Sequence, residues 1–281
     1  MIKRTISTIV LWAVVIGTIV WFGATGGVVL LAVFSTLAQY EFNNLLEKCG
    51  LPPWKWATLA LGFAMVLQAG LNLKCGYYLP SLMAVALTLG ALSCAQNPTA
   101  HNRLAGSVLS IAYVPGMMMF YGFILGFWSL IPALQSYDYP DQAGIYMAIW
   151  VIAVAKFTDV GGYLVGRAIG RHKLAPSISP GKTWEGVVGG LALAIVVGML
   201  SWKFGPDALH DMLSPTSALL LPLPIGIAAI VSDLSESVFK RRAGLKDSGN
   251  AIPGIGGALD LADSLLLAGP VAFALLVLTT K

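Results

Sequence analysis

Apolar residues follow one another along this chain in long continuous runs, separated by short polar segments rich in glycine and proline. Most runs approach the ~20 residues that an α-helix needs to cross a bilayer. Because the runs do not alternate between apolar and polar residues, they argue against the strands of a membrane β-barrel. The pattern predicts nine membrane-spanning helices, at about residues 6–22, 25–46, 54–72, 77–95, 105–133, 143–166, 185–202, 216–238 and 258–279.

The composition supports this assignment. Of the 281 residues, 57% are hydrophobic and 11% are charged, and the mean hydropathy is +0.79, whereas soluble domains carry about 25% charged residues. So few charges could not cover the surface of a soluble protein of this length. The expected fold class is therefore an all-α integral membrane protein, a polytopic helical bundle with about nine transmembrane helices in one domain (1–281).

The positions of the basic residues predict an orientation. If Lys3 and Arg4 are cytosolic, the nine spans place most of the 17 Lys and Arg residues in cytosolic loops, as the positive-inside rule requires. We therefore expect a multi-pass protein of the cell (inner) membrane with its N-terminus inside and its C-terminus outside. The net charge of +4 is explained by this topology, and no nucleic-acid partner is expected.

Chemically unusual residues concentrate in the second half. Residues 1–150 contain only isolated polar features, such as Glu41, and are expected to be mainly scaffold, whereas 151–281 should carry the catalytic motifs. Acidic residues recur there at helical spacing, which puts the members of each set on one helix face. The three sets are Asp159, Gly162, Tyr163 and Gly166; Asp233, Glu236, Ser237 and Lys240; and Asp260, Asp263 and Ser264.

These acidic faces should lie at a similar shallow depth. Counted from the basic loops at 1.5 Å per residue, Asp159 and Asp233 lie about 10–12 Å into the membrane. Ionised side chains within spans are costly, so they need partners. One explanation is interhelical salt bridging with Lys156, Lys240 or Lys246. The other is a divalent cation in a water-filled cavity, since oxygen ligands suit magnesium or manganese.

Two basic loops flank these faces, GRHKLAPSISPGKTWEG (170–186) and KRRAGLKDSGNAIPGIGG (240–257). The positive-inside rule alone would place basic residues here. However, both loops lie beside the carboxylate faces and open onto helix N-termini, which bind phosphate well. Cations next to a carboxylate-held metal are suited to a polyphosphate substrate.

At these residues the chain resembles a known family. The segment 232–264 resembles the C-terminal signature of CDP-diacylglycerol synthases, also called phosphatidate cytidylyltransferases, and 159–186 resembles a second block of that family. The core S-x-x-K-R-x4-K-D stands here as Ser237, Lys240, Arg241, Lys246 and Asp247. Two positions depart from the family pattern: Ile255 replaces a common His, and Leu261 replaces a common Arg.

The resemblance implies that the protein joins CTP and phosphatidate to give CDP-diacylglycerol and pyrophosphate, with Mg²⁺ or another divalent cation as cofactor. It implies metal ligation by Asp233, Asp260 and Asp263, which with Lys246 form the catalytic set. The expected substrate-binding residues are Asp159, Ser179, Lys182, Thr183, Ser237, Lys240, Arg241 and Asp247. The site should face the cytosol, where CTP and the membrane lipid can meet.

Two other functions remain open from the sequence. A CTP-dependent lipid or polyprenol kinase would share the nucleotide and the membrane setting. A cation-coupled transporter would also contain intramembrane acids, but its polar groups should extend through the full membrane depth. Finally, the small residues Gly162, Gly166, Gly170, Gly186 and Gly190 favour close helix packing and leave a homodimer open.

Overall fold

The structure of the protein, a computed structural model, describes residues 2–71, 98–126, 143–251 and 256–279. Its chain divides into two compact units. Unit 1 comprises Met1–Gly126 and Phe239–Ala262, and unit 2 comprises Phe127–Val238 and Asp263–Lys281. The signature segment 232–264 is thus divided between the two units.

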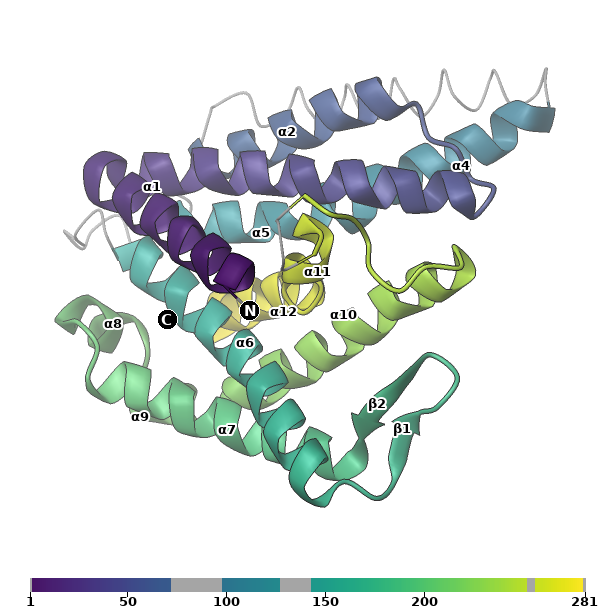
Figure 1. Ribbon diagram of the computed structural model, residues 1–281. Helices are drawn as coiled ribbons and strands as arrows, with labels where there is room; N and C mark the ends of the chain where they lie inside the picture. The colour runs from purple at the N-terminus through teal and green to yellow at the C-terminus, as the bar shows by residue number, and fades with distance from the viewer. Residues whose placement is uncertain (1, 72–97, 127–142, 252–255, 280–281) are drawn as a thin grey trace. The chain divides into compact units, whose positions relative to one another are not determined.

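Unit 1 is built from helices that pack around a long first helix (Figure 1). Its helices are α1 (Ile2–Lys48), α2 (Lys55–Leu71), α4 (Pro98–Tyr113), α5 (Pro115–Leu125) and α11 (Ala258–Ala262). The Gln39 amide of α1 donates hydrogen bonds to the Thr58 carbonyl oxygen (2.9 Å) and the Ser110 hydroxyl (3.0 Å). Because all three residues are buried, these bonds tie α1 to α2 and α4 in the interior of unit 1.

Helix α1 is broken at Gly23, which has φ 57° and ψ −144°. Only glycine adopts this backbone conformation without strain, and the chain turns sharply there (Figure 1). The two arms of α1 match the spans expected at 6–22 and 25–46. The break at Gly23 within α1 therefore lies between the two spans that the sequence predicted.

Unit 2 consists of helices and one small sheet. Its elements are α6 (Ala143–Ile169), β1 (Lys173–Ala175), β2 (Ser179–Thr183), α7 (Trp184–Lys203), α8 (Asp207–Met212), α9 (Pro215–Leu220), α10 (Pro222–Arg242, of which residues to Val238 belong here) and α12 (Leu265–Thr279). Strands β1 and β2 pair antiparallel and form a hairpin between α6 and α7.

Helices α6 and α7 pack closely because glycines face one another. A Cβ atom at Gly161 would lie 2.8 Å from the Gly189 carbonyl oxygen, and one at Gly186 would lie 2.7 Å from that of Gly162. The indole of Trp150, fully buried, donates to the Gly198 carbonyl oxygen (2.9 Å) at the other end of the pair. The glycine spacing noted in the sequence is thus used within this chain, for helix packing.

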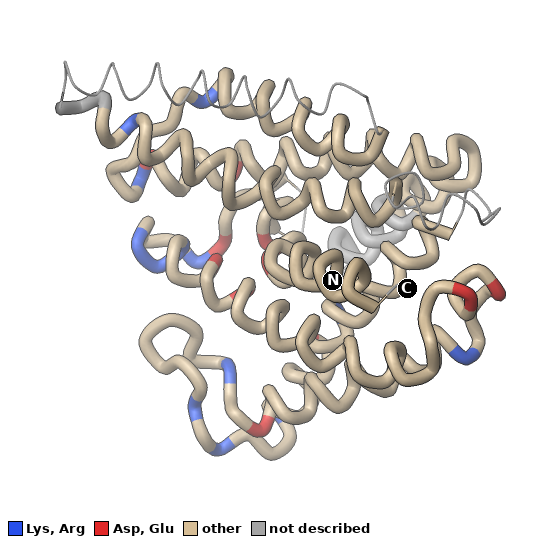
Figure 2. The backbone as a smooth tube through the Cα atoms, turned by 180° about the vertical axis from the view of Figure 1, so that it is seen from behind, with Lys and Arg blue, Asp and Glu red and all other residues tan. Residues whose placement is uncertain are grey.

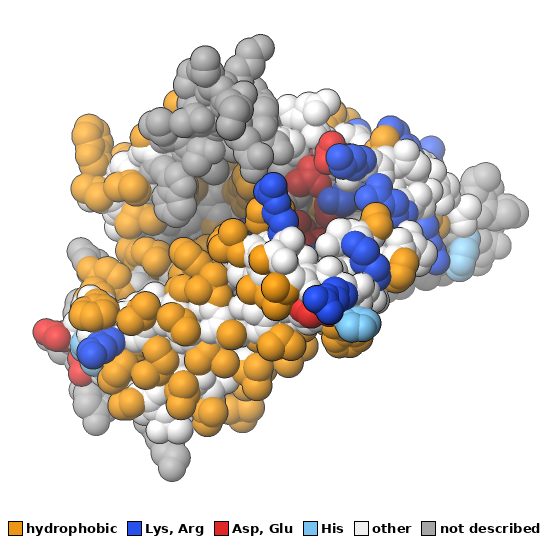
Figure 3. All heavy atoms as spheres, turned by 60° about the horizontal axis from the view of Figure 1, so that its bottom comes forward, with side chains coloured by type: hydrophobic (Ala, Val, Ile, Leu, Met, Phe, Trp, Pro, Cys, Tyr) orange, Lys and Arg blue, Asp and Glu red, His pale blue; other side chains and the backbone are white. Residues whose placement is uncertain are grey.

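The surface and the charges agree with a membrane protein. Large apolar side chains on α6 and α7, including Phe157, Leu164 and Val188, are exposed, and Figure 3 presents many such side chains on the described surface. Charged residues gather at opposite ends of α7 (Figure 2). The basic hairpin precedes its N-terminus, and Lys203 and the acidic helix α8 follow at its C-terminus.

Within the described residues, six helices are long and apolar enough to cross a membrane, so the expected count of nine is not confirmed. They are Ala13–Lys48, His101–Leu125, Ala143–Ile169, Trp184–Lys203, Pro215–Arg242 and Ala258–Thr279. The 17-residue helix Lys55–Leu71 matches the span expected at 54–72 but is shorter. The span expected at 77–95, the end of that at 105–133 and position Ile255 lie outside the described residues.

Two sequence-based expectations were wrong in detail. An all-α fold was expected, but the loop 170–186 contains the β1–β2 hairpin. A continuous ninth helix was expected to carry Asp263 and Ser264 on one face, but the helix is interrupted there, between α11 and α12. The cause is a long-range contact: the Ser232 hydroxyl donates to the Asp263 carbonyl oxygen and accepts from the Leu267 N–H (3.2 Å).

Candidate active site

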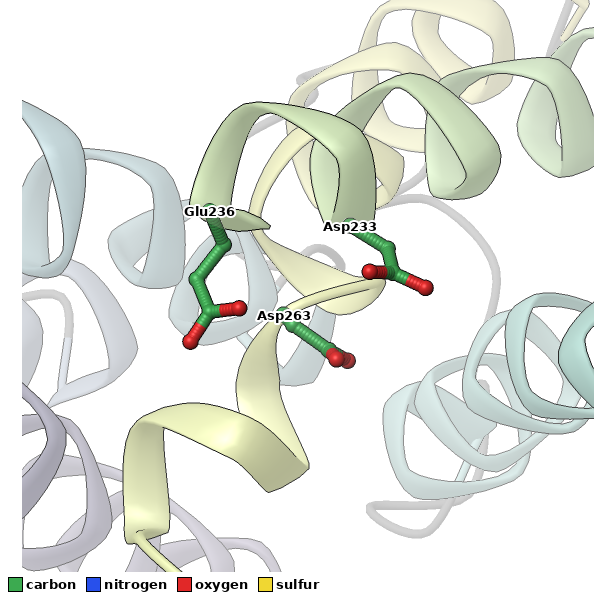
Figure 4. A group of neighbouring side chains, drawn as sticks. All are labelled: Asp233, Glu236 and Asp263. Carbon is green, nitrogen blue, oxygen red and sulfur yellow. The ribbon is translucent and has the colours of Figure 1, made fainter. Parts of the chain in front are cut away.

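Three carboxylates of unit 2 lie close together (Figure 4). Asp233 and Glu236 lie one turn apart on α10, and Asp263 lies in the turn that precedes α12. One oxygen atom from each lies within 4.8 Å of those of the other two. Glu236 is fully buried, whereas the other two are partly exposed. Like charges at this distance repel one another, so the group favours a bound cation.

The helix break gives Asp263 its position. Helix α11 ends at Ala262, and α12 begins at Leu265. The Asp263 carboxylate accepts a hydrogen bond from the Ser264 N–H (2.6 Å), which would have no helical partner at this break. At this break the Asp263 carboxylate lies within 4.8 Å of those of Asp233 and Glu236, while its backbone carbonyl accepts from Ser232.

Two lysines neutralise part of this charge. The Lys182 ammonium lies 2.7 Å from the Asp233 carboxylate. The Lys156 ammonium lies 3.5 Å from Asp263 and 3.9 Å from Asp159, and it donates to the Ser264 hydroxyl (2.8 Å). These two ammonium groups are thus shared among the carboxylates of Asp159, Asp233 and Asp263.

The hairpin positions Lys182. Strand β2 runs directly into α7, with Thr183 as the N-cap residue whose hydroxyl accepts from the Gly186 N–H (3.1 Å). Glu185, in the first turn of α7, accepts from the Arg171 and His172 N–H groups (3.1 and 3.2 Å) and pairs with the His172 ring (2.6 Å). The base of the hairpin is therefore fastened to the helix that follows it.

A pocket of about 510 Å³ lies between the hairpin and helices α6, α7 and α10. Its lining includes the acidic residues Asp159 and Asp233 and the basic residues Arg167, Lys173 and Lys182. Glycines form part of the wall, which leaves room for a ligand beside the backbone. The volume falls within the range of small-molecule sites, ~300–1,000 Å³. Anionic and cationic sides in one pocket suit a metal-bound phosphate ligand.

Asp260, the other expected metal ligand, belongs to unit 1. Its carboxylate accepts from the Lys240 ammonium (2.9 Å), the Ser248 N–H (3.1 Å) and the Gly257 N–H (2.9 Å). Gly257 precedes α11, so this last bond caps the helix from its third residue, as in a capping box. Asp260 thus organises the loop after α10 as well as pairing with Lys240.

The remaining expected residues fall into two groups. Ser179 lines the unit 2 pocket, and Ser237 on α10 donates to Asp233 (3.4 Å). In unit 1, Lys246 and Asp247 are exposed in the loop after α10, and Arg241 donates to the Leu245 carbonyl oxygen (3.0 Å). The structure therefore brings Asp159, Asp233 and Asp263 together in unit 2. Lys246 and Asp247, in the loop after α10, belong to unit 1.

Sequence reasoning placed Glu236 on the correct helix face but did not include it among the ligands. The i, i+3 spacing from Asp233 was the available signal. Of the salt bridges weighed as the alternative, those of Lys156 and Lys240 are present, whereas Lys246 forms none among the described residues. Lys156 was not expected to touch Asp159 and Asp263 together, because that contact depends on how α6 packs beside the α12 turn.

Comparison with known proteins identifies the family of the whole chain. The family model described as "Cytidylyltransferase family" matches residues 2–279. Over 279 residues the chain is 32% identical to the phosphatidate cytidylyltransferase of Brucella suis, covering 95% of this chain and 92% of that protein. It is 32% identical to that of Staphylococcus haemolyticus, covering 90% and 91%.

A shorter and more similar match spans about half of each protein. Over 137 residues the chain is 40% identical to the phosphatidate cytidylyltransferase of Haemophilus influenzae, covering 49% of this chain and 48% of that protein. The family model nevertheless covers nearly the whole chain, and the full-length matches exceed 30% identity. The chain therefore belongs to the cytidylyltransferase family.

Proposed function

We propose that this protein transfers the cytidylyl group of CTP to phosphatidate, giving CDP-diacylglycerol and pyrophosphate in phospholipid biosynthesis. The observation that carries the proposal is the carboxylate group of Asp233, Glu236 and Asp263 beside the basic pocket, in a chain of the cytidylyltransferase family. The names of the full-length relatives supply the lipid substrate.

In this reaction a phosphate oxygen of phosphatidate attacks the α-phosphorus of CTP. The new P–O bond forms as the bond to the β-phosphate oxygen breaks, and pyrophosphate leaves with both electrons of that bond. Negative charge must be neutralised at both substrates for them to approach. Lys182, Arg167 and Lys173, which line the unit 2 pocket, are suited to hold the phosphate groups by positioning and electrostatics.

A divalent cation, Mg²⁺ in the simplest case, would be held by Asp233, Glu236 and Asp263. Carboxylate oxygens are ligands that Mg²⁺ prefers, and one oxygen atom of each of these side chains lies within 4.8 Å of the other two. When bound, the metal supplies charge neutralisation at the phosphates. Asp260, which the family resemblance also makes a ligand, stays a prediction.

The other assignments follow from charge and position. Lys240, Arg241 and Lys246 are proposed to bind substrate phosphate, and Asp159 and Asp247 to orient cations or the nucleotide. Ser179, Thr183 and Ser237 provide hydroxyl groups to the same substrates. The kinase and transporter alternatives are not favoured by the family membership.

We also propose that the site faces the cytosol of a bacterial cell membrane. The support is the division of charge along α7, with the basic hairpin before it and Asp207 and Asp211 after it, as the positive-inside rule requires. Nine spans and a homodimer remain predictions. After replacement of the native cysteines, Ser177→Cys at the exposed hairpin should resist an impermeant reagent on intact cells, whereas Asp211→Cys should react. The reverse result would overturn the orientation.

The proposed reaction is tested with purified protein in detergent, given CTP, Mg²⁺ and phosphatidate. We expect a CDP-lipid and one pyrophosphate per lipid converted, and no product from diacylglycerol. The Asp233→Asn variant is the matched control, because it keeps the shape of the side chain and removes its charge. Formation of CDP together with a phosphorylated lipid would instead identify a kinase.

A further inference from the structure

A buried carboxylate in the first half of the chain contacts the signature loop. Glu41 lies on α1 in unit 1 and is only 4% exposed. It is one of few acidic residues in the first 126 residues, a region expected to be scaffold. A carboxylate is rarely retained within an apolar helix unless it binds something, so its partners indicate its role.

The partners of Glu41 lie in the loop after α10 and in the helix α11 that follows this loop. Its carboxylate accepts from the Leu259 N–H (2.8 Å) and from the Ser248 hydroxyl (3.2 Å). Both donors bond the same oxygen atom, Oε2. Residues separated by more than 200 positions in the chain are thus joined by one buried side chain, which contacts the loop after α10 at Ser248 and the helix α11 that follows it at Leu259.

Asp260 holds the same loop from its other side. It accepts from the backbone N–H of Ser248 and of Gly257, while Glu41 accepts from the Ser248 side chain. Ser248 is therefore shared by the two carboxylates. Asp260 in turn pairs with Lys240, whose ammonium lies 2.9 Å from the Asp260 carboxylate. Glu41 is therefore connected to Lys240 through Ser248 and Asp260. A shift of Glu41 would move Ser248 and, with it, the backbone beside Lys246 and Asp247.

Two glycines make the close approach of Glu41 possible. A Cβ atom at Gly249 would overlap one oxygen of the Glu41 carboxylate, and a Cβ atom at Gly257 would overlap the other. The backbone does not require glycine at 249 or 257, because neither residue has a positive φ. The glycines of unit 1 that do have a positive φ are Gly23, Gly50, Gly244 and Gly256. Small residues at 249 and 257 are therefore explained by the space that Glu41 occupies.

We propose that Glu41 is a positioning residue for cytidylyl transfer. It fixes the loop after α10, which contains Lys246, and through Ser248 it fixes the Asp260 carboxylate that pairs with Lys240. The expected effect on KM for CTP rests on the proposed function. The expected fixing of the loop by Glu41 does not. It assigns a role in the reaction to the first half of the chain. A purely structural role would affect folding and leave the affinity for CTP unchanged.

The test compares Glu41→Gln with Glu47→Gln, an exposed acid on the same helix. In Glu41→Gln we expect KM for CTP to rise at least tenfold, while turnover at saturating CTP falls less than threefold. Limited trypsin digestion in detergent supplies a measurement that needs no activity. Cleavage at the exposed residues Arg241, Arg242 and Lys246 should accelerate severalfold, and cleavage at Arg171 and Lys173 in the hairpin should not.

Each outcome decides the proposal. Unchanged KM and unchanged loop cleavage in Glu41→Gln would overturn it, as would an equal change in Glu47→Gln. If Glu41→Gln does not fold, Ser248→Ala removes only the side-chain contact and must reproduce both effects, or the proposal fails. If the wild-type protein forms no CDP-lipid, the proposed function fails, and loop cleavage alone still decides whether Glu41 holds the loop.

Discussion

The ammonium of Lys182 lies 2.7 Å from the carboxylate of Asp233, which joins the β1–β2 hairpin to helix α10. Both side chains are largely but not completely buried, with about a quarter of each exposed (25% and 22%). The pair therefore lies at the boundary of the pocket. There we propose that Asp233 exchanges the lysine for a metal and that Lys182 turns to a substrate phosphate.

Replacement of Lys182 should separate its role in the pocket from its role in topology. In Lys182→Met we expect turnover to fall at least ~100-fold, the typical cost of losing one charge-stabilising contact in a transition state. The affinity for Mg²⁺ should not fall, because Asp233 loses a competing partner. The measurement is turnover against Mg²⁺ concentration. Lys203→Met, at the other end of α7, is the control. If both variants lower turnover by the same small factor, Lys182 serves only membrane orientation.

The metal ligands can be identified without activity. A ligand present at 100 times its Kd stabilises a protein by about 2.7 kcal/mol, so Mg²⁺ should raise the midpoint of thermal unfolding in detergent. Asp233→Asn, Glu236→Gln and Asp263→Asn should each lose this rise and at least ~100-fold in turnover. Asp211→Asn, in the acidic helix α8, should keep both.

The same measurement on Asp260→Asn decides between two ligand sets. Loss of the Mg²⁺-dependent rise would support the set implied by the family resemblance. Retention of the rise, with loss of turnover, would limit Asp260 to holding the loop and Lys240. Full turnover of the wild-type protein in a chelator would end the metal assignment altogether.

Helix periodicity predicted much of this site. The spacing of Asp233 and Glu236 placed them on one face of a helix, and α10 is helical throughout that stretch. The same reasoning placed Asp159 beside Gly162 and Gly166, and all three line the pocket. Such reasoning works because it needs only the 3.6-residue repeat, a local property of the chain.

The missed features depend on contacts between distant residues. The break at Asp263 is stabilised by Ser232, 31 positions away, and no local signal such as glycine or proline marks it. The hairpin lacks the alternating apolar pattern of a half-buried strand and is held by Glu185 instead. Glu41 was visible as an isolated acid, but its partners Ser248 and Leu259 could not be inferred from periodicity.

The glycine contacts between α6 and α7 predict a large effect of a small side chain. At Gly190 a Cβ atom would meet the Thr158 carbonyl oxygen and lie 3.2 Å from the Gly162 nitrogen. Gly190→Ala should therefore destabilise the protein by about 1–3 kcal/mol, as overpacking does. Gly17→Ala, where nothing lies within 4 Å, should be neutral or slightly stabilising. Unchanged stability with a changed oligomeric state in Gly190→Ala would instead indicate a dimer interface.

Replacement of Lys156 can show whether the carboxylates of unit 2 are explained by salt bridges or by a bound metal. Its ammonium bridges Asp159 and Asp263 and donates to Ser264. In Lys156→Met the two carboxylates lose their shared cation, so in a chelator the free energy of unfolding should fall by about 2 kcal/mol, the scale of a charged hydrogen bond.

Added Mg²⁺ should restore part of this loss if Asp263 is a metal ligand, because the metal supplies the charge that the lysine no longer does. The measurement is the thermal midpoint of Lys156→Met in detergent across a Mg²⁺ titration, with Ca²⁺ and Na⁺ of equal ionic strength as controls. Recovery with Mg²⁺ and not with Na⁺ would support a divalent site among these carboxylates. Equal recovery with Na⁺ would mean that screening of repulsion suffices, and the carboxylates would then be ion-pairing residues that hold α6, α10 and the α12 turn together.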